Sequence, residues 1–544
     1  MKKHRLRTVT FRLVIALFLT ALTLVPSLPA TTPADHATLG IIIQADDVTA
    51  AAAAVRAVGG TVTHELGIID AVGARLTPGQ LEALRKQDGV CEVYEDRAVR
   101  VSGRPAPDTV YPTLVGADQL HGEGVNGLGV TVAVVDTGVI SMVELNKTPD
   151  REWRVLAQYD AILDRTVSPG KAAMPTDESG HGTHVSSIIL SSGATKHPTK
   201  YSGVAPYANL VSVKAFDADG AGSYLDVIRG IDWVVDHEGE YGIRVLNLSF
   251  SALPQSDYWD DPLNQAVMRA WQAGIVVVTS GGNTGPESMR VGVPGNVPYV
   301  ITVGAMSDNY TPENPEDDHL ASFSAAGPTV EGFVKPEVVA PGGHMLALMP
   351  NYSQIAREHP EYHERGAYFT MSGTSQAAAV TTGIVALMLQ QDPTLTPDDV
   401  KCRLMSSARP AQDENGDPAY SVFQQGAGLV NAYDAVYSTA SGCANRGLDV
   451  DLDLSGEQHY RGRANRDEKG NYVITDLDGY AWSGGFAWGD GFAWSDDFAW
   501  SDDFAWGDGF AWSDDFAWSD DFAWSDGFAW GDATMAVNEW VPQE

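Results

Sequence analysis

Apolar positions between about residues 111 and 440 form short continuous runs that are separated by helical patterns. The runs TVAVVD, NLVSVKAF, RVLNLSF, GIVVVTS and YVITVGA are rich in β-branched residues, and stretches such as SYLDVIRGIDWVVDH and PLNQAVMRAWQAG repeat apolar residues at helical spacing. Continuous apolar strands that alternate with helices indicate a parallel sheet covered on both faces. The pattern therefore predicts an α/β fold with a doubly wound, mostly parallel sheet, which we place at residues 105–442.

A different pattern precedes this region, between Ala37 and Val101. The order is LGIIIQ, an Ala-rich helical stretch, TVTHEL, AVGARL, a second helical stretch at PGQLEALRKQ, and VCEVYEDRAVRV. This β-α-β-β-α-β order predicts a compact α+β, ferredoxin-like unit at residues 31–104. Many functions use this arrangement, so its role depends on the region that follows it.

The N-terminus and the net charge limit the compartment and the partners. Basic residues from Lys2 to Arg12 precede an apolar run, Leu13 to Val25, and small residues near Ala30 follow it. This pattern is typical of a secretory signal peptide, at residues 1–30, and predicts a secreted, extracellular or cell-surface protein. An uncleaved anchor is the alternative, but the run is shorter than the ~20 apolar residues that span a bilayer.

The net charge limits the partners. Lys and Arg number 35 against 71 Asp and Glu, which gives a net charge of −36. Such a charge repels phosphate and excludes nucleic acid as a partner.

Three junctions between predicted strands and helices carry residues that can react. Asp136 directly follows TVAVV, His181 stands between two glycines at the start of a helical pattern, and Ser375 precedes a long apolar helix. Each residue alone has an ordinary structural interpretation, such as a turn or helix cap. A hydroxyl nucleophile needs a base, and the base needs an orienting carboxylate. Together the three residues form a candidate triad for acyl transfer.

The motifs around these residues resemble the three signatures of the subtilisin-like serine proteases, the subtilase family. They are VAVVDTGV, SGHGTHV and SGTSQAA, in the order Asp, His, Ser, and GVAP, VLNLSFS, VVVTSGGNTGP, KPEVVAPG and GAGLVNAYDAV extend the resemblance over roughly residues 111–436. The resemblance implies a serine endopeptidase that hydrolyses peptide bonds in polypeptide substrates through an acyl-enzyme, without a cofactor for catalysis. It also implies that structural calcium is an option, but no segment locates a metal site. We expect a monomer.

The resemblance assigns roles to individual residues. Asp136 would orient His181, His181 would act as general base and then general acid, and Ser375 would attack the scissile carbonyl, whereas His184 would not be catalytic. The side chain of Asn283 and the backbone N–H of Ser375 would form the oxyanion hole. Two backbone edges would pair with an extended substrate. These edges are Gly220, Ala221 and Gly222, and Ser249, Phe250 and Ser251.

The chain also departs from the family pattern. Ala252 stands where glycine is usual, which is expected to narrow the first specificity pocket, and Gln376 and Ala379 replace the usual Met and Pro. A lipase or esterase with the same triad is a remote alternative, because its Ser would precede the acid and the His. A further alternative is a weak or inert subtilase fold that serves as a surface or glycan-binding module through its C-terminal repeats. The intact Asp136, His181, Asn283 and Ser375 argue against that interpretation.

The resemblance also gives the unit at residues 31–104 a role, as the inhibitor-type propeptide of a zymogen. The propeptide would act as an intramolecular inhibitor until it is cut in the linker VSGRPAPDTVYP, between Ser102 and Tyr111. An independent accessory domain is the alternative.

The C-terminal part combines a polar stretch, interpreted as a linker at residues 443–479, with hexapeptide repeats of the FAWSDD type at 480–533. The two aromatic residues of each repeat are two positions apart and share a face of a short strand, and the remaining residues are typical of turns. Three interpretations stay open for the repeats. They are a flexible tail, an aromatic stripe that contacts glycans or the cell surface, and Asp-rich turns that bind Ca²⁺. The flexible tail is slightly favoured.

Three cysteines fit a secreted protein. Cys91 lies in the predicted propeptide, which leaves Cys402 and Cys443 as one candidate disulfide of the mature chain. Two buried free thiols are the alternative.

Overall fold

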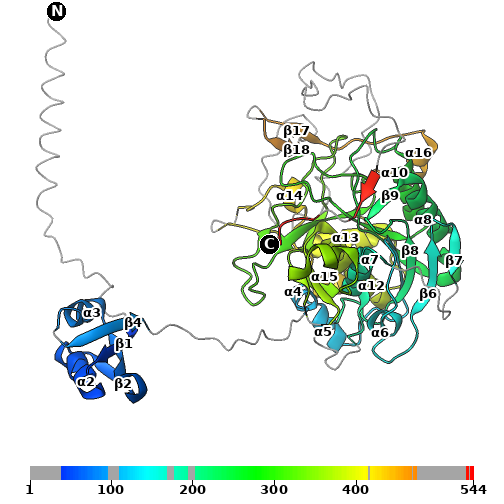
Figure 1. Cartoon of the computed structure of the whole chain (residues 1–544). Coiled ribbons are helices and arrows are strands. Elements are labelled where there is room, and N and C mark those ends of the chain that lie inside the picture. The colour runs from blue at the N-terminus through cyan, green and yellow to red at the C-terminus, as the bar shows by residue number, and fades with distance from the viewer. Residues whose placement is uncertain are drawn as a thin grey trace, which may run out of the picture. The chain divides into compact units, whose positions relative to one another are not determined.

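The chain forms two compact units, Met1–Pro105 and Ala106–Glu544 (Figure 1). The computed structural model describes residues 38–87, 89–95, 109–167, 177–193, 202–364, 366–413, 417–467, 470–474, 534–537 and 540–543. The predicted signal peptide and the hexapeptide repeats lie outside the described residues, as does most of the predicted cleavage region. None of the described helices is both long and apolar enough to cross a membrane.

The first unit has the β-α-β-β-α-β order that the sequence pattern predicts, with one 3-10 turn added before the third strand. Its four strands form an antiparallel sheet in the order β2-β3-β1-β4. Ile41 and Ile43 alternate along one face of β1 and pack with Val55 and Leu84 of the two helices into a core of the unit's own. The elements are β1 (Leu39–Ala45), α2 (Val48–Ala57), β2 (Thr61–Leu66), η2 (Gly67–Ile69), β3 (Ala71–Leu76), α3 (Pro78–Leu84) and β4 (Val90–Glu95).

A nine-stranded sheet lies at the centre of the second unit. Its strand order is β13-β12-β11-β10-β5-β8-β6-β7, and β14 also pairs with β12. The inner pairs are parallel, whereas β13 and β7 pair antiparallel at the edges. The predicted mostly parallel sheet of an α/β fold is therefore confirmed. The strands are β5 (Thr131–Asp136), β6 (Val155–Asp160), β7 (Arg165–Val167), β8 (Asn209–Lys214), β10 (Ile243–Leu248), β11 (Val276–Ser280), β12 (Ile301–Ser307), β13 (His319–Leu320) and β14 (Val338–Pro341).

The order of the strands changes direction at β5. After β5 the chain adds β6 and β8 on one side of this strand, and it then crosses to add β10, β11 and β12 on the other side. In open α/β sheets, such a switch point leaves a crevice at the carboxyl end of the strand, where ligands bind. The last residue of β5 is Asp136.

Two pairs of helices cover the sheet. Helices α7 and α12 pack against each other and contact β5, while α8 and α10 pack against each other and contact β5 and β11 respectively. All six residues of β5 are buried, as expected for a strand that is covered on both faces. The helices are α4 (Tyr111–Leu114), α5 (Ala117–Gly122), α6 (Val143–Asn146), α7 (His181–Leu190), α8 (Tyr224–Asp236), α9 (Glu238–Tyr241), α10 (Pro262–Gln272), α11 (Gln354–Glu358), η3 (Pro360–Tyr362), α12 (Thr374–Gln391), α13 (Pro397–Ser407), α14 (Val422–Gln425), α15 (Ala432–Tyr437) and α16 (Val450–Ser455).

The stretch interpreted as a linker at residues 443–479 differs from the prediction over its described residues. Val450 and Leu454 of α16 pack against the main core of the second unit. Asp453 is buried, and its Oδ2 accepts hydrogen bonds from the hydroxyls of Tyr258 at 2.6 Å and Tyr299 at 3.0 Å. The polar composition of the stretch conceals these apolar residues at helical spacing. The unit therefore continues past the expected boundary at residue 442.

A disulfide joins Cys402 of α13 to Cys443, with 5.3 Å between the two Cα atoms. It attaches the start of the stretch at residues 443–479 to α13. Of the two alternatives for this pair, the structure contains the disulfide and not the free thiols.

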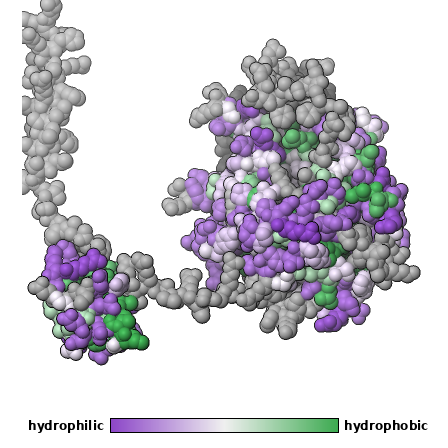
Figure 2. Space-filling view, in the orientation of Figure 1, coloured by the Kyte–Doolittle hydropathy of each residue, from purple (hydrophilic) through white to green (hydrophobic). Residues whose placement is uncertain are grey.

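Three small antiparallel sheets complete the second unit. They are β15 (Met345–Leu348) with β16 (Tyr368–Met371), β17 (Ala464–Arg466) with β18 (Tyr472–Ile474), and β9 (Ala221–Ser223) with β19 (Thr534–Ala536). The last pair brings residues near the C-terminus beside β9, where β19 is the red arrow in Figure 1. The described surface of this unit is mostly hydrophilic on the face shown in Figure 2, and its apolar side chains form small separate patches.

Candidate active site

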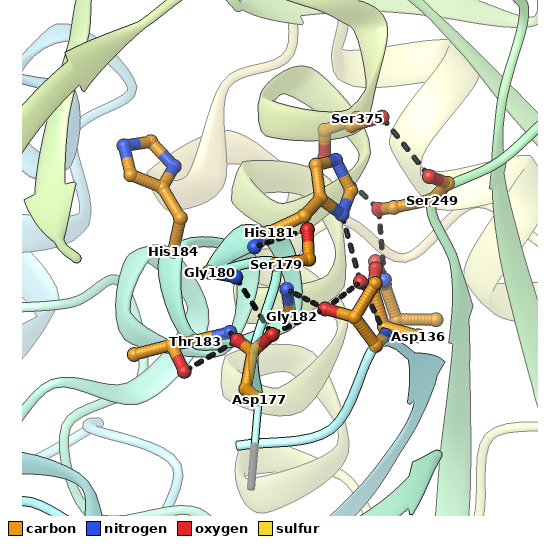
Figure 3. Close-up of polar contacts among 12 residues, drawn as sticks. Asp136, Asp177, Ser179, Gly180, His181, Gly182, Thr183, His184, Ser249 and Ser375 are labelled. Atoms are coloured by element: carbon orange, nitrogen blue, oxygen red, sulfur yellow. Dashed lines mark hydrogen bonds and ion pairs between the residues drawn. The ribbon is translucent and has the colours of Figure 1, made fainter. Parts of the chain in front are cut away.

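Asp136 is buried at the carboxyl end of β5, at the switch point of the sheet. Its Oδ1 atom accepts a hydrogen bond from His181 Nδ1 at 2.7 Å and another from the backbone N–H of Thr137 at 2.8 Å (Figure 3). A carboxylate that accepts from Nδ1 keeps the proton on that nitrogen and leaves Nε2 as the basic atom of a neutral imidazole. Asp136 therefore sets both the orientation and the tautomer of His181.

His181 is fully buried at the first position of α7. Its Nε2 atom has no hydrogen-bond partner among the described residues. The neighbouring Gly182 has to be a glycine, because an added Cβ would lie 2.2 Å from the carbonyl oxygen of Gly138. The close approach lets the start of α7 contact the loop after β5, and this contact brings the imidazole to Asp136.

A second buried carboxylate, Asp177, holds the segment before α7 in place. Its oxygens accept hydrogen bonds from Thr137 Oγ1 at 2.7 Å, Gly180 N at 2.7 Å, and Thr183 N and Oγ1 at 2.8 and 2.6 Å. Burial raises the pKa of Asp177, while these hydrogen bonds act in the opposite direction. No motif in the sequence points to Asp177. The residue lies four positions before the first residue of α7, outside the N-cap position where carboxylates commonly accept from backbone N–H groups.

Ser375 is the second residue of α12 and is only 6% exposed. Its hydroxyl donates a hydrogen bond to the carbonyl oxygen of Ser249 at 3.0 Å, and the Ser249 hydroxyl donates to the Ser375 carbonyl at 3.1 Å. Figure 3 places Ser375 beside the imidazole of His181, with the hydroxyl directed to Ser249. The structure thus brings together all three residues of the candidate triad.

Asn283 lies close to the same helix start. Its Oδ1 atom accepts hydrogen bonds from the backbone N–H of Thr374 at 2.9 Å and from its hydroxyl at 2.8 Å. The Nδ2 atom lies beside Gly373, since a Cβ added to that glycine would be 3.4 Å from it. The first N–H groups of a helix have no acceptor within the helix. The amide and the first turn of α12 therefore offer donors that suit a developing oxyanion.

His184 and Gln376 lie next to each other, His184 on the same helix as His181 and Gln376 on the same helix as Ser375. His184 is buried, its Nε2 lies 3.1 Å from the carbonyl oxygen of Phe369, and burial lowers its pKa to about 3. Gln376 is also buried, with its Nε2 3.4 Å from His184 Nδ1. His184 is therefore a neutral core residue, and Gln376 places a buried amide directly after Ser375, where the family pattern has a thioether.

The predicted substrate edges lie in two segments of the second unit. Ala221 and Gly222 belong to β9, which is paired with β19, and Ser249 contacts Ser375 directly. The ring of Phe250 is buried against Phe216, with 5.0 Å between the ring centroids. The remaining predicted edge residues, Gly220 and Ser251, directly adjoin these elements.

A metal site cannot be assigned from the geometry. Within the part of the chain that the structure describes, no group of three or more His, Cys, Asp and Glu side chains is arranged to hold an ion. The arrangement at the end of β5 instead combines a carboxylate, an imidazole, a hydroxyl and amide donors, which is the set of groups that acyl transfer requires.

Comparisons with known proteins agree with this chemistry. The model of the subtilase family matches residues 127–428. The chain is 38% identical over 374 residues to serine protease AprX of Bacillus subtilis (strain 168), covering 68% of this chain and 79% of that protein. It is 30% identical over 379 residues to subtilisin E of the same organism, covering 69% and 83%. Among solved structures, it is similar to fervidolysin from Fervidobacterium pennivorans, with a TM-score of 0.46, 24% identity, and coverage of 81% of this chain and 65% of that chain. By the family model and by its identity to AprX, the chain belongs to the subtilase family and is a subtilisin-like serine endopeptidase.

Proposed function

We propose that Ser375 is the nucleophile, His181 the general base and Asp136 the carboxylate that orients it. The observation that carries this proposal is the 2.7 Å hydrogen bond between His181 Nδ1 and Asp136 Oδ1. It leaves Nε2 as the basic nitrogen, in a buried position where that atom has no partner among the described residues. A base in this state is ready to accept a proton from a hydroxyl brought next to it.

The reaction begins when the Ser375 hydroxyl turns about its Cα–Cβ bond from the Ser249 carbonyl to His181 Nε2. Nε2 takes the hydroxyl proton while Oγ attacks the carbonyl carbon of the peptide, and Asp136 stabilises the imidazolium that forms. The imidazolium then gives its proton to the leaving amine, and the acyl-enzyme remains. Water attacks the acyl-enzyme with the same base, which releases the acid and restores Ser375.

The oxyanion of each tetrahedral intermediate is held by Asn283 Nδ2 and by the backbone N–H of Ser375. Thr374 supports this assignment, because its two hydrogen bonds to Oδ1 fix the amide with Nδ2 on the side of Gly373. Donors that are fixed before the reaction stabilise developing charge without reorganisation, which is usually the largest single contribution to such catalysis.

The substrate binds as an extended strand along β9 and along the second edge at residues 249–251. Main-chain pairing provides affinity for many unfolded polypeptides, and side-chain pockets add selectivity. Ala252, whose backbone N–H and carbonyl pair with Val293 at 2.9 and 2.8 Å, continues this second edge. Catalysis needs no cofactor.

The proposal includes secretion and maturation of a zymogen. Residues 1–30 act as the signal peptide, and the ferredoxin-like unit at 31–104 acts as an inhibitor-type propeptide. The separate core of the first unit and its boundary next to Ala106 support this organisation. Surface or glycan contacts of the repeats at 480–533 stay a prediction.

The test uses residues 31–544, as wild type and as Ser375→Ala, followed by chain mass and casein hydrolysis. We expect the wild type to lose its N-terminal residues up to a point between Ser102 and Tyr111 and to digest casein. The Ser375→Ala chain should keep its mass and lose activity by about 10⁶-fold, the loss known for the nucleophile of subtilisin. Ser406→Ala, at an exposed position of α13, is the matched control and should behave as wild type. Maturation or casein hydrolysis by Ser375→Ala would overturn the assignment.

A further inference from the structure

We infer that residues 534–543, here called the C-terminal segment, bind the substrate groove of their own catalytic unit as a peptide ligand. The inference rests on the proposed function, because it uses β9 as the edge to which substrates pair. It goes further by naming an occupant of that edge and the side chains that the groove accepts.

The main chain of the C-terminal segment pairs with β9 in the way proposed for a substrate. Strand β19 runs antiparallel to β9, with Met535 opposite Gly222, and Thr534 and Ala536 opposite their β9 neighbours. The pairing continues beyond the strand, because the backbone N–H of Val537 donates to the Gly220 carbonyl at 2.8 Å. The edge at Gly220–Ser223 is therefore already occupied by the protein's own chain.

Two side chains of the segment are buried in this position. Met535 is completely buried and Val537 is 5% exposed, and both belong to the main core of the second unit. They are two residues apart, so they lie on the same side of the strand. Opposite Met535, a Cβ on Gly222 would lie 2.6 Å from the ring of Phe216, so β9 lies directly on that ring. The site beside β9 thus holds a long unbranched apolar side chain and, two residues later, a branched aliphatic one.

The segment has a second point of attachment after residues 538–539, which lie outside the described residues. The ring of Trp540 stacks on His359, with 3.6 Å between centroids and 7° between planes, and its centroid is 6.1 Å from that of Phe369. Phe369 belongs to β16, which ends four residues before Ser375. Farther along, the Ser372 hydroxyl donates to Gln543 Oε1 at 3.1 Å.

The described parts of the segment therefore contact the substrate edge and also the strand that leads into the nucleophile. A chance surface contact would leave its apolar side chains exposed, but Met535, Val537 and Val541 are all buried. A ligand tethered to the same chain acts at an effective concentration of about 1 mM. A groove that binds the free segment with a Kd of about 0.1 mM would then show a KM raised about tenfold, with kcat unchanged, because segment and substrate compete.

The first experiment compares the matured full chain as wild type, Met535→Asp and Leu163→Asp. Met535→Asp places a charge in the buried position and should lower the KM for a peptide substrate about tenfold without changing kcat. Leu163 is 65% exposed between β6 and β7, so Leu163→Asp is the matched control and should keep the wild-type KM. Equal KM values in wild type and Met535→Asp, with the C-terminus intact by mass, would overturn the inference.

The second experiment adds synthetic peptides to the Met535→Asp enzyme, which covers the case in which the wild type loses its C-terminus during maturation. A peptide of residues 534–543 should inhibit competitively, and the same peptide with Met535→Asp should inhibit at least about tenfold less. Equal inhibition by the two peptides, or none, would overturn the inference. If every chain is inactive, the proposed function fails. Calorimetry of the two peptides then still tests the inference, because the wild-type peptide should bind more tightly than the peptide with Met535→Asp.

Discussion

Two buried carboxylates lie on either side of Thr137, and their partners give them different roles. Asp136 directs Oδ1 to the imidazole of His181, whereas Asp177 accepts only from hydroxyl and backbone donors. The Thr137 hydroxyl links the two segments, because it donates to Asp177 at 2.7 Å and accepts from the backbone N–H of Gly182 at 2.8 Å. Asp136 thus orients the imidazole of His181, whereas Asp177 holds the segment before α7 in place.

The three residues of the candidate triad could be selected from the sequence because each lies next to or at the start of an element with a clear pattern. Asp136 follows a continuous β-branched run, and Ser375 precedes a long apolar helix. Asp177 could not be selected, because it lies outside the usual capping position of α7 and because its hydrogen bond from Thr137 depends on the fold. The direction of the Ser375 hydroxyl, toward Ser249, depends on side-chain rotation and is likewise absent from the sequence pattern.

At the residue scale, His184 makes stability depend on pH. Its pKa falls from 6.5 to about 3 on folding, because burial disfavours the charged imidazole. Below its ordinary pKa the unfolded chain therefore binds a proton that the folded chain does not, and stability falls as the pH drops toward 3. Between pH 7 and pH 4.5 the expected loss is about 2 to 3 kcal/mol.

The measurement compares the free energy of unfolding at the two pH values, in a Ser375→Ala background that prevents self-digestion. His184→Gln cannot be protonated and keeps a donor for the Phe369 carbonyl, so it should lose about 2 to 3 kcal/mol less than its parent. If both chains lost the same free energy, His184 would not be the group responsible.

At the scale of elements, the disulfide connects α13 to the stretch that follows α15. Cys402 and Cys443 are 41 positions apart. In the chain-entropy account, closing a loop of this length stabilises the folded state by about 3 to 4 kcal/mol. We expect the double variant Cys402→Ala, Cys443→Ala to lose about that much free energy of unfolding, measured in urea in the Ser375→Ala background. A reducing agent should lower the free energy of unfolding of the parent and leave that of the double variant unchanged. A double variant as stable as its parent would contradict this account.

The elements that the sequence predicted are those with a strong period of their own. Strands β5, β8, β10 and β11 are continuous β-branched runs, and α8 and α10 repeat apolar residues at helical spacing. Helix α16 is six residues long and alternates apolar residues with two aspartates, so its apolar contacts gave no clear helical signal. Strand β19 has three residues and pairs with β9, which is more than 300 positions away in the sequence. No local sequence pattern therefore predicts this strand.

At the scale of the whole molecule, the second unit includes more of the chain than its sequence motifs suggest. The family model ends at residue 428, but buried Asp453 and the apolar residues of α16 belong to the same core. Removing this stretch would leave the hydroxyls of Tyr258 and Tyr299 without their acceptor. A buried donor that loses its partner costs about 1 to 3 kcal/mol.

Two truncated chains test this boundary, both with Ser375→Ala and Cys402→Ala so that the disulfide is absent from each. The chain that ends at residue 474 should unfold at least about 5 °C above the chain that ends at residue 442, since a few kcal/mol moves the midpoint of a large unit by several degrees. Thermal unfolding followed by circular dichroism gives both midpoints. Equal midpoints would show that residues 443–474 contribute nothing to the folded unit.

The hydrogen bonds between Thr374 and Asn283 have a consequence for how this enzyme tolerates sequence change. Thr374 immediately precedes Ser375, and both of its polar groups bind the Asn283 amide. A small translation of α12, caused by a change in the residues packed along it, therefore moves Ser375 and the Asn283 amide together. Their separation is conserved during such a drift, while their position relative to β9 is not. Substitutions along α12, of which Ala379 is one, thus leave Ser375 aligned with Asn283 while they change its position relative to β9 and to His181 of α7.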